Sequence, residues 1–360
     1  MKEEIKIIDG RKVLIRERKD TGFVFEPEAP KDYVRKTSFN PDAPLGRMSA
    51  APAMPVIFKD GHGWNDIINQ FKPEMQFNSK FDSFSCTIFS SAKALCAYLL
   101  KVYGIKITIS EMFNAFYAGV VSGRGTSVRQ ALESFRTKGW VEDKDYPFTA
   151  ETTQQQYFSR PPMTIELKAK GVLTKWNVYW EAVGYSGNVP HSQIITSLQK
   201  APVLCSGFAW ASYYGEGVYY DYNNPANHLF CVSDWFNNPE YDLLANDSYP
   251  QDNQYDEDSA PEEFEKKLAK SFRIWSAHRI WLMPVKKDLS LILNLKNMLT
   301  TVIRDLRGGF WFIKDKKRQK INKYSLDIMT VLSREAGIKT VNDKELNNYQ
   351  ETTEFYPVVN

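Results

Sequence analysis

Cysteine is scarce in this sequence. Its 360 residues include only Cys86, Cys96, Cys205 and Cys231. Small secreted domains held together by disulfides carry far more cysteine for their length, so this class is excluded and we expect reduced thiols. The first residues, MKEEIKIIDGRK, lack the apolar core of a secretory signal. We therefore expect an intracellular protein.

Long apolar runs and a charge bias are also absent. No apolar run approaches the roughly 18 residues that cross a bilayer, so no membrane span is predicted. The 46 basic and 43 acidic residues leave a net charge of +3, which gives no electrostatic basis for binding nucleic acid. No cysteine–histidine spacing resembles a zinc site, and the acidic segment 251–265 lacks the glycine of a calcium loop. We predict no metal and no cofactor.

Apolar and aromatic residues are plentiful, at 43% and 14% of the sequence, which indicates a packed core. The length suits one large domain with appendages. Residues 1–55 are predicted to form an N-terminal arm, a hairpin around Asp9-Gly10 followed by a proline-rich strap. Residues 56–285 form the main domain. Residues 286–360 form a C-terminal helical extension with a basic surface run, Lys314 to Lys320.

The expected helices come early in the main domain and the strands come late. Helical periodicity covers residues 86–103, ended by Gly104, and then 127–139 and 192–201. Strands are expected at 202–208, 227–235, 241–249 and 272–284. Without strict βαβ alternation, this order predicts an α+β fold. In the extension, apolar residues at helical spacing over 289–307 predict an amphipathic helix that packs against the chain itself, a second copy or a protein partner.

Cys86 is a candidate nucleophile because it stands where the first of these helices begins. A thiol reacts as its thiolate, and the positive end of a helix dipole favours that form. Taken alone, the position favours a buried structural cysteine, because free cysteine is among the most buried residue types. Cys96, in the middle of the same helix, is interpreted as a core residue.

A base and an orienting group are available on the late strands. Of the four histidines, His228 begins the strand 227–235, whereas His62, His191 and His278 are assigned to a loop, a helix start and a structural strand position. Asn246 and Asp247 end the following strand, and either one could accept a hydrogen bond from the imidazole. Because strand faces alternate, a shift of one residue decides between the two.

The order of these residues and the segments around them resemble the papain-like cysteine peptidases. The separation of Cys86 and His228 falls within the roughly 130–150 residues typical of that family. The segments that carry the likeness, in the family's order, are FSCTIFSSA (84–92), ITISEMFNAF (107–116), GRGTSVRQALESFRTKGWVEDKDYPF (123–148), LQKAPVLCSGFAWASYYGEGVYY (198–220), NHLFCVSDW (227–235) and LLANDSYP (243–250). The likeness as a whole covers about residues 70 to 285.

The resemblance implies a papain-like two-part domain, with the active site between a helical half and an antiparallel β half. It implies a cysteine peptidase that acts on a protein or peptide substrate. Cys86 would be the nucleophile, His228 the base, Asp247 or Asn246 the orienting group and Gln76 an oxyanion donor. Divergent bacterial or bacteriophage members look most similar, so we expect a cytoplasmic or virion-associated location.

Several positions depart from the family pattern. Thr87 stands where the family has tryptophan, and Lys80 stands at the position of its oxyanion glutamine. Gln76 can take that role only if the loop before Cys86 is longer than usual. The family's inhibitory pro-segment is not evident. Two alternatives therefore stay open: a cell-wall peptide amidase with the same triad, and a catalytically degraded scaffold used in assembly.

Overall fold

The structure is a computed structural model. It describes residues 2–8, 10–17, 23–24, 54–184, 187–213, 217–221, 225–250, 256 and 258–285, and the strands at 301–305, 310–314, 317–320, 339–341 and 350–351. The chain divides into two compact units, Met1–Val285 and Lys286–Asn360. Among the described residues, no helix combines the length and apolar character needed to cross a membrane.

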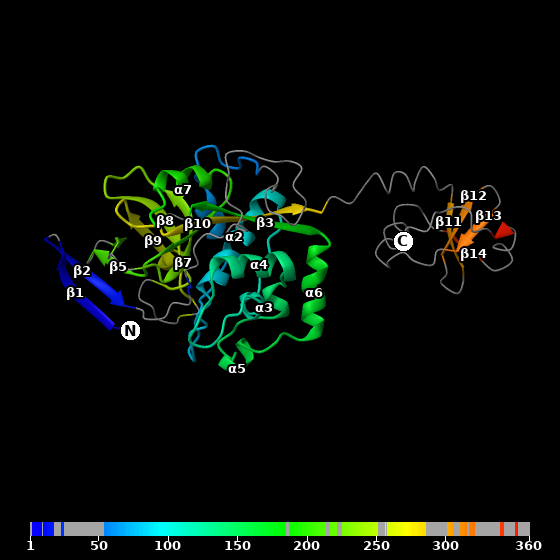
Figure 1. The fold of residues 1–360 in the computed structure, drawn as a ribbon, viewed down its shortest axis with the longest axis horizontal. Coiled ribbons are helices and arrows are strands. Elements are labelled where there is room, and N and C mark those ends of the chain that lie inside the picture. Colours follow the sequence, from blue (N-terminus) through cyan, green and yellow to red (C-terminus); the bar gives the residue numbers. More distant parts are fainter. Residues whose placement is uncertain are drawn as a thin grey trace. The chain divides into compact units, whose positions relative to one another are not determined.

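The first unit combines helices with one large sheet (Figure 1). Its helices are α1 (Trp64–Ile68), α2 (Cys86–Tyr103), α3 (Glu111–Tyr117), α4 (Val128–Lys138), α5 (Gln154–Tyr157), α6 (Met163–Leu173) and α7 (His191–Leu198). Its strands are β1 (Lys2–Ile8), β2 (Arg11–Glu17), β3 (Trp176–Gly184), β4 (Val203–Gly207), β5 (Ala211–Tyr213), β6 (Val218–Tyr219), β7 (His228–Trp235), β8 (Tyr241–Asn246), β9 (Glu265–Ala269) and β10 (Ser276–Pro284).

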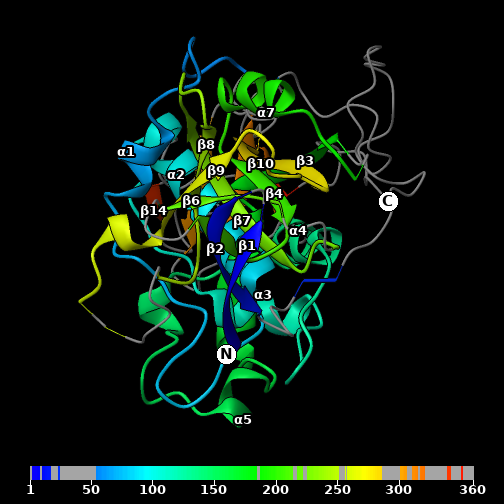
Figure 2. The same cartoon turned by 90° about the vertical axis from the view of Figure 1, so that its left-hand side faces the viewer.

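These strands form a ten-stranded sheet in the order β1-β2-β5-β6-β9-β8-β7-β4-β10-β3. Among the described strand pairs of this sheet, β6 and β9 are parallel and the others are antiparallel. Helix α7 lies at one end of the unit, and α3 and α5 lie at the other (Figures 1 and 2). The α+β fold class is therefore confirmed.

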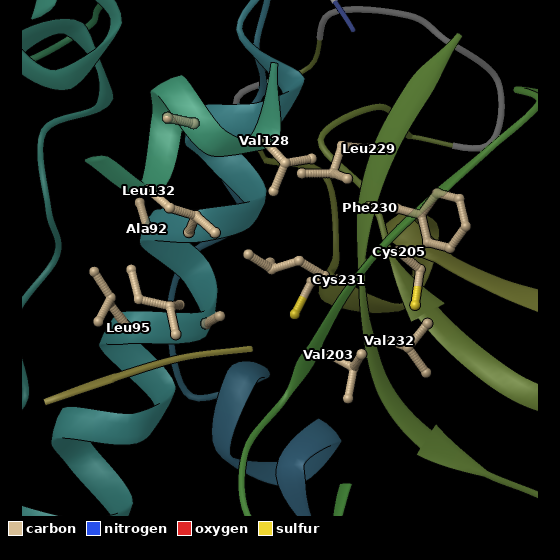
Figure 3. Packing of buried hydrophobic residues seen from close by; sticks show 14 of the residues in the cluster. Ala92, Leu95, Val128, Leu132, Val203, Cys205, Leu229, Phe230, Cys231 and Val232 are labelled. Atoms are coloured by element: carbon tan, nitrogen blue, oxygen red, sulfur yellow. The ribbon is translucent and has the colours of Figure 1, made fainter. Parts of the chain in front are cut away.

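Helix α2 joins the helical part to the sheet. Its sequence alternates small and large apolar residues, and nearly every side chain from Cys86 to Leu99 is buried. Gly104 ends the helix in the left-handed conformation, with φ +68, that glycine adopts without a steric penalty. Figure 3 shows Leu229 and Cys231 of β7 facing the helices, whereas Phe230 points to the other side of the strand. This alternation is the pleat of a β-strand.

The predicted elements of the main domain are confirmed at 86–103, and with small shifts at α4, α7, β4, β7, β8 and β10. The hairpin at the N-terminus is also confirmed, with Ile8 opposite Arg11. Its strand β2 pairs with β5, so the hairpin extends the sheet of the first unit. Val24 N donates to Thr126 O at 3.0 Å. The proline-rich strap falls largely outside the described residues.

The helix predicted over 289–307 is wrong in its described part. Thr301–Asp305 forms strand β11, which pairs with β12 (Phe310–Lys314). The β-branched run of Thr301, Val302 and Ile303 explains the difference, because such residues favour strands over helices. The strands β13 (Lys317–Lys320), β14 (Lys339–Val341) and β15 (Gln350–Glu351) complete a five-stranded sheet in the second unit. In its described part, the predicted helical extension is thus a β-sheet, and the rest of 289–307 lies outside the described residues.

Candidate active site

Cys86 is the first residue of α2, and its side chain is fully buried. Its sulfur receives a backbone hydrogen bond from Leu229, the residue next to His228 on β7. Ser90, one helical turn further along α2, donates to the backbone oxygen of Leu229 at 3.0 Å. The start of α2 is therefore fixed against the start of β7, the strand that begins with His228.

The surroundings of Cys86 favour its neutral form. Burial raises the pKa of the thiol well above its ordinary value, and the carboxylates of Asp247 and Asp82 raise it further. Backbone hydrogen bonds from Leu229 and Thr87 act in the opposite direction and do not offset the burial. In this closed arrangement Cys86 carries its proton, so a thiolate forms only when a neighbouring base accepts that proton.

His228 and Asp247 form a short hydrogen bond inside the protein. His228 Nε2 lies 2.6 Å from Asp247 Oδ1, and both side chains are completely buried. An ionised carboxylate only accepts hydrogen bonds, so Nε2 carries the hydrogen. The other ring nitrogen, Nδ1, is buried and has no hydrogen-bond partner among the described residues. A neutral His228 therefore keeps a lone pair on Nδ1 that can take a proton.

The carboxylate of Asp247 is held from several sides. Trp210 Nε1 donates to Oδ2 at 2.8 Å, and the Ser248 amide donates to Oδ1 at 2.7 Å. Burial alone raises the pKa of Asp247, but His228, Lys266 and the Ser248 amide outweigh it and lower that pKa to about 2. Asp247 is thus ionised at neutral pH.

Asn246 takes part in a different set of contacts. Its Nδ2 donates to Asn65 Oδ1 at 2.7 Å and to Ser233 Oγ at 3.0 Å. These groups belong to α1 and to the face of β7 that is opposite His228. Of the two candidates that the sequence left open, the structure therefore brings Asp247 to the imidazole, and Asn246 tethers α1 to the sheet.

Gln76 is paired with Ser83, three residues before Cys86, because the loop between them folds back on itself. Phe77 and Asp82 form an antiparallel bridge, and Ser83 N donates to Gln76 O at 2.8 Å. The long loop that the Gln76 assignment required is therefore present. Lys80, at the family's glutamine position, lies at the tip of this loop, where its exposed ammonium pairs with Glu151 at 3.1 Å.

The side-chain amide of Gln76 is already engaged. It donates to Asp82 Oδ1 at 3.0 Å and to the hydroxyl of Tyr249, and its oxygen accepts from Ser248 Oγ at 2.8 Å. Tyr249 in turn donates to Asp82 Oδ2 at 2.5 Å. Both N–H groups of Gln76 are used inside this network, so one of these bonds must break before Gln76 can serve a substrate.

The remaining histidines lie away from Cys86. His191 bonds Asp242 Oδ1 at 2.6 Å and Phe272 O at 2.8 Å, and it thereby fixes the start of α7 to the sheet. His62 bonds Asp234 at 2.6 Å and stacks on Trp235. His278 is buried on β10 beside Trp180. His62 and His278 lie in the loop and on the strand expected for them, whereas His191 at the start of α7 is largely buried in its bonds to Asp242 and Phe272.

A second polar cluster lies behind the site and was missed in the sequence. Lys93 Nζ donates to the backbone oxygen of Asp247 at 2.6 Å. A cavity in this region is lined by Glu74, Lys93 and Asn246, among others. Burial raises the pKa of Glu74 to about 7, although a hydrogen bond to the buried Glu111 opposes the shift. The only signal in the sequence is that Lys93 lies two helical turns after Cys86, on the same face of α2.

All four cysteines are free. Within the described part of the chain, no group of three or more acidic, histidine or cysteine side chains is arranged to hold a metal ion.

No protein-family model matches the sequence, and no curated protein matches it. One similar solved structure is the proform of Amb a 11, a cysteine protease and major ragweed pollen allergen, with a TM-score of 0.44 and 15% identity over 66% of this chain and 68% of the allergen. Xylellain, a cysteine protease from Xylella fastidiosa, has a TM-score of 0.47 and 12% identity over 74% of this chain and 97% of its own. A cysteine protease of Carica candamarcensis has a TM-score of 0.40 and 15% identity over 62% and 96%. In fold, and at this distance, the chain is similar to the papain-like cysteine proteases.

Proposed function

We propose that the protein is a cysteine peptidase that hydrolyses peptide bonds with Cys86, His228 and Asp247. The observation that carries the proposal is the buried bond between His228 Nε2 and Asp247 Oδ1 at 2.6 Å. This bond leaves His228 Nδ1 free of other described partners, so that it can accept a proton. The next residue in the chain, Leu229, makes the backbone hydrogen bond to the Cys86 sulfur. A nucleophile, a base and an orienting acceptor are the groups that acyl transfer through a covalent intermediate requires.

In the first half of the reaction, His228 Nδ1 takes the proton of Cys86. The sulfur attacks the peptide carbonyl carbon, and the carbonyl electron pair moves to its oxygen. When the tetrahedral intermediate collapses, the carbon–nitrogen bond breaks and the imidazolium gives its proton to the leaving amine. In the second half, a water molecule loses a proton to His228 and attacks the thioester, and the thiol leaves with that proton. Asp247 holds the imidazole and stabilises its charged form throughout.

The oxyanion requires hydrogen-bond donors near the start of α2. The backbone N–H of Cys86 is one candidate, because the first N–H groups of a helix have no partner within the helix. The side chain of Gln76 is the second, once Asp82 or Tyr249 has released one of its N–H groups. Because Cys86 is fully buried, a substrate reaches the sulfur only after neighbouring groups have moved.

The proposal is tested by comparing Cys86→Ala with Cys96→Ala on casein and on a peptide library. Both residues lie on α2 and are buried, so the second variant controls for loss of packing. We expect Cys86→Ala to abolish hydrolysis with little change in melting temperature, and Cys96→Ala to keep activity. Full activity in Cys86→Ala would contradict the proposal. Release of peptides from peptidoglycan, without cleavage of casein, would favour the cell-wall amidase.

A catalytically degraded scaffold is the second candidate. Two observations favour it: the buried thiol of Cys86 and the engagement of both Gln76 N–H groups. Thiol labelling at low pH separates this candidate from the peptidase, because only a thiol activated by its surroundings reacts under those conditions. If Cys86 in the folded protein reacts no faster than a buried core cysteine at every pH, the scaffold is favoured.

A further inference from the structure

Lys266 is a buried cation close to the candidate active site. It lies on β9, and only 1% of its surface is exposed. A buried ammonium group is unfavourable unless an opposite charge and hydrogen bonds compensate it. The adjacent Lys267 is exposed, as expected from the alternation of a strand. The position of Lys266 therefore needs a compensating anion on the inner face of the sheet.

The strand register places one carboxylate, that of Asp247, on this face. Lys266 is paired with Ala245 on β8, and the Asp247 amide continues the ladder by donating to Phe264 O at 3.0 Å. Asp247 follows the last residue of β8 and continues its alternation, so it lies on the same face as Ala245 and Lys266. Asn246, which pairs with Glu265, belongs to the opposite face.

The contacts of the ammonium group keep it on this face. Lys266 Nζ donates to the backbone oxygen of Tyr249 at 3.2 Å and lies 5.5 Å from the centroid of the Tyr219 ring. Tyr219 packs edge-on against Trp210, at 5.2 Å between centroids, and Trp210 donates to Asp247 Oδ2. The ammonium of Lys266 and the carboxylate of Asp247 are therefore both buried beside the same pair of aromatic rings, Tyr219 and Trp210.

We propose that Lys266 is a positioning residue of the site and acts as the counter-ion of Asp247. The carboxylate that accepts the hydrogen bond of His228 then belongs to an ion pair with no net charge. This inference rests on the proposed peptidase function. A lone buried carboxylate would strongly favour the protonated imidazole, and a protonated His228 cannot take the proton of Cys86. The counter-ion limits this effect, while the 2.6 Å bond still orients the ring. A neutral asparagine at residue 247 would need no such cation.

Other charged groups near His228 act on it less directly. Lys93 reaches the backbone oxygen of Asp247 and not its carboxylate. Asp82 bonds Gln76 and Tyr249 and, together with Asp247, raises the pKa of the Cys86 thiol. Lys266 is therefore the group whose removal is expected to change the charge balance at the carboxylate of Asp247.

The test is a double-variant cycle of Asp247→Asn, Lys266→Met and the two combined. Each single change leaves one buried charge without its partner, so we expect each to lower the melting temperature by several degrees and kcat/KM by roughly tenfold or more. The combined variant removes both charges and should recover most of the melting temperature. It should also recover activity relative to Lys266→Met. Lys267→Met, on the solvent face of the same strand, is the matched control and should change neither quantity.

The pH profile separates positioning from a merely structural role. Lys266→Met removes a positive charge near the imidazole, so the acidic limb of kcat/KM should move to higher pH. Asp247→Asn removes a negative charge and should move the limb to lower pH, and the combined variant should lie near the parent. Additive losses of stability in the combined variant, or an unchanged limb in Lys266→Met, would overturn the inference.

The coupling of Asp247 and Lys266 can be tested independently of the proposed peptidase function. If the parent protein hydrolyses no peptide, the function fails, but the melting temperatures and an NMR titration of the His228 ring still measure the coupling of Asp247 and Lys266. If neither single variant folds, we still expect the combined variant to fold. A combined variant that also fails to fold would overturn the coupling.

Discussion

Asn246 and Asp247 are neighbours in the chain, yet their side chains serve opposite faces of the sheet. Asn246 bonds Asn65 and Ser233, whereas Asp247 bonds His228 at 2.6 Å. We expect Asp247→Ala to lower kcat/KM by roughly a thousandfold or more, because the imidazole loses its orienting acceptor. Asn246→Ala removes a buried tether and should act mainly on stability, by about 1–3 kcal/mol. Steady-state kinetics and thermal melting of the two variants measure the difference, and the reverse ranking of activities would contradict this assignment.

The choice between these residues shows where prediction from the sequence stops. Helix α2 was predictable because its apolar periodicity and Gly104 are local signals, and the segment order around Cys86 and His228 indicated the α+β arrangement. The orienting residue was not predictable, since a shift of one residue in strand register reverses which side chain faces the histidine. Lys266 gave no signal, because nothing in EKKLA distinguishes a buried lysine from an exposed one. In the second unit, the apolar spacing predicts a helix where the described residues 301–305 form strand β11, because short apolar runs are compatible with both structures.

The network around Gln76 predicts an effect of Asp82 on the thiol. Asp82→Asn removes a carboxylate that raises the pKa of Cys86, and it weakens the hold on the Gln76 amide. Asparagine keeps an oxygen that can accept from Phe84 N, so the loop should be preserved. We expect alkylation of Cys86 by iodoacetamide to extend to lower pH in this variant. The Lys80→Ala variant, changed at the exposed tip of the same loop, provides the control. A profile identical to that of the parent would show that Asp82 has no influence on the thiol.

Glu74 predicts a pH dependence of stability. Burial raises its pKa in the folded protein to about 7, from 4.5 for an ordinary glutamate. Between these values the folded state binds more protons than the unfolded state, so the free energy of unfolding falls as pH rises from about 4.5 through 7. The loss is on the order of 2–3 kcal/mol. Urea unfolding of the parent and of Glu74→Gln at pH 5 and pH 8 measures this: the variant should lose less stability between the two, and an equal loss would contradict the prediction.

Two histidine–aspartate pairs of equal length predict different contributions to stability. The His191–Asp242 and His62–Asp234 bonds are both 2.6 Å, but the His191 side chain is 11% exposed and that of His62 is 43% exposed. His191 also bonds Phe272 O, so His191→Ala leaves buried acceptors without donors and should cost about 2 kcal/mol. For His62→Ala we expect less than about 1 kcal/mol. Chemical denaturation of both variants gives the comparison, and equal losses would show that burial does not decide the effect.

The central claim is that His228 is the base for Cys86, and the pH dependence of Cys86 alkylation tests it most directly. Iodoacetamide modification is followed by mass spectrometry of the Cys86 peptide in the parent and in His228→Gln, with both variants shown to be folded by circular dichroism. Burial alone raises the pKa of the thiol, so without His228 the reaction should be confined to alkaline pH. We predict that the parent reacts near neutral pH at least about tenfold faster than His228→Gln. Identical rate–pH profiles for the two proteins would contradict the account.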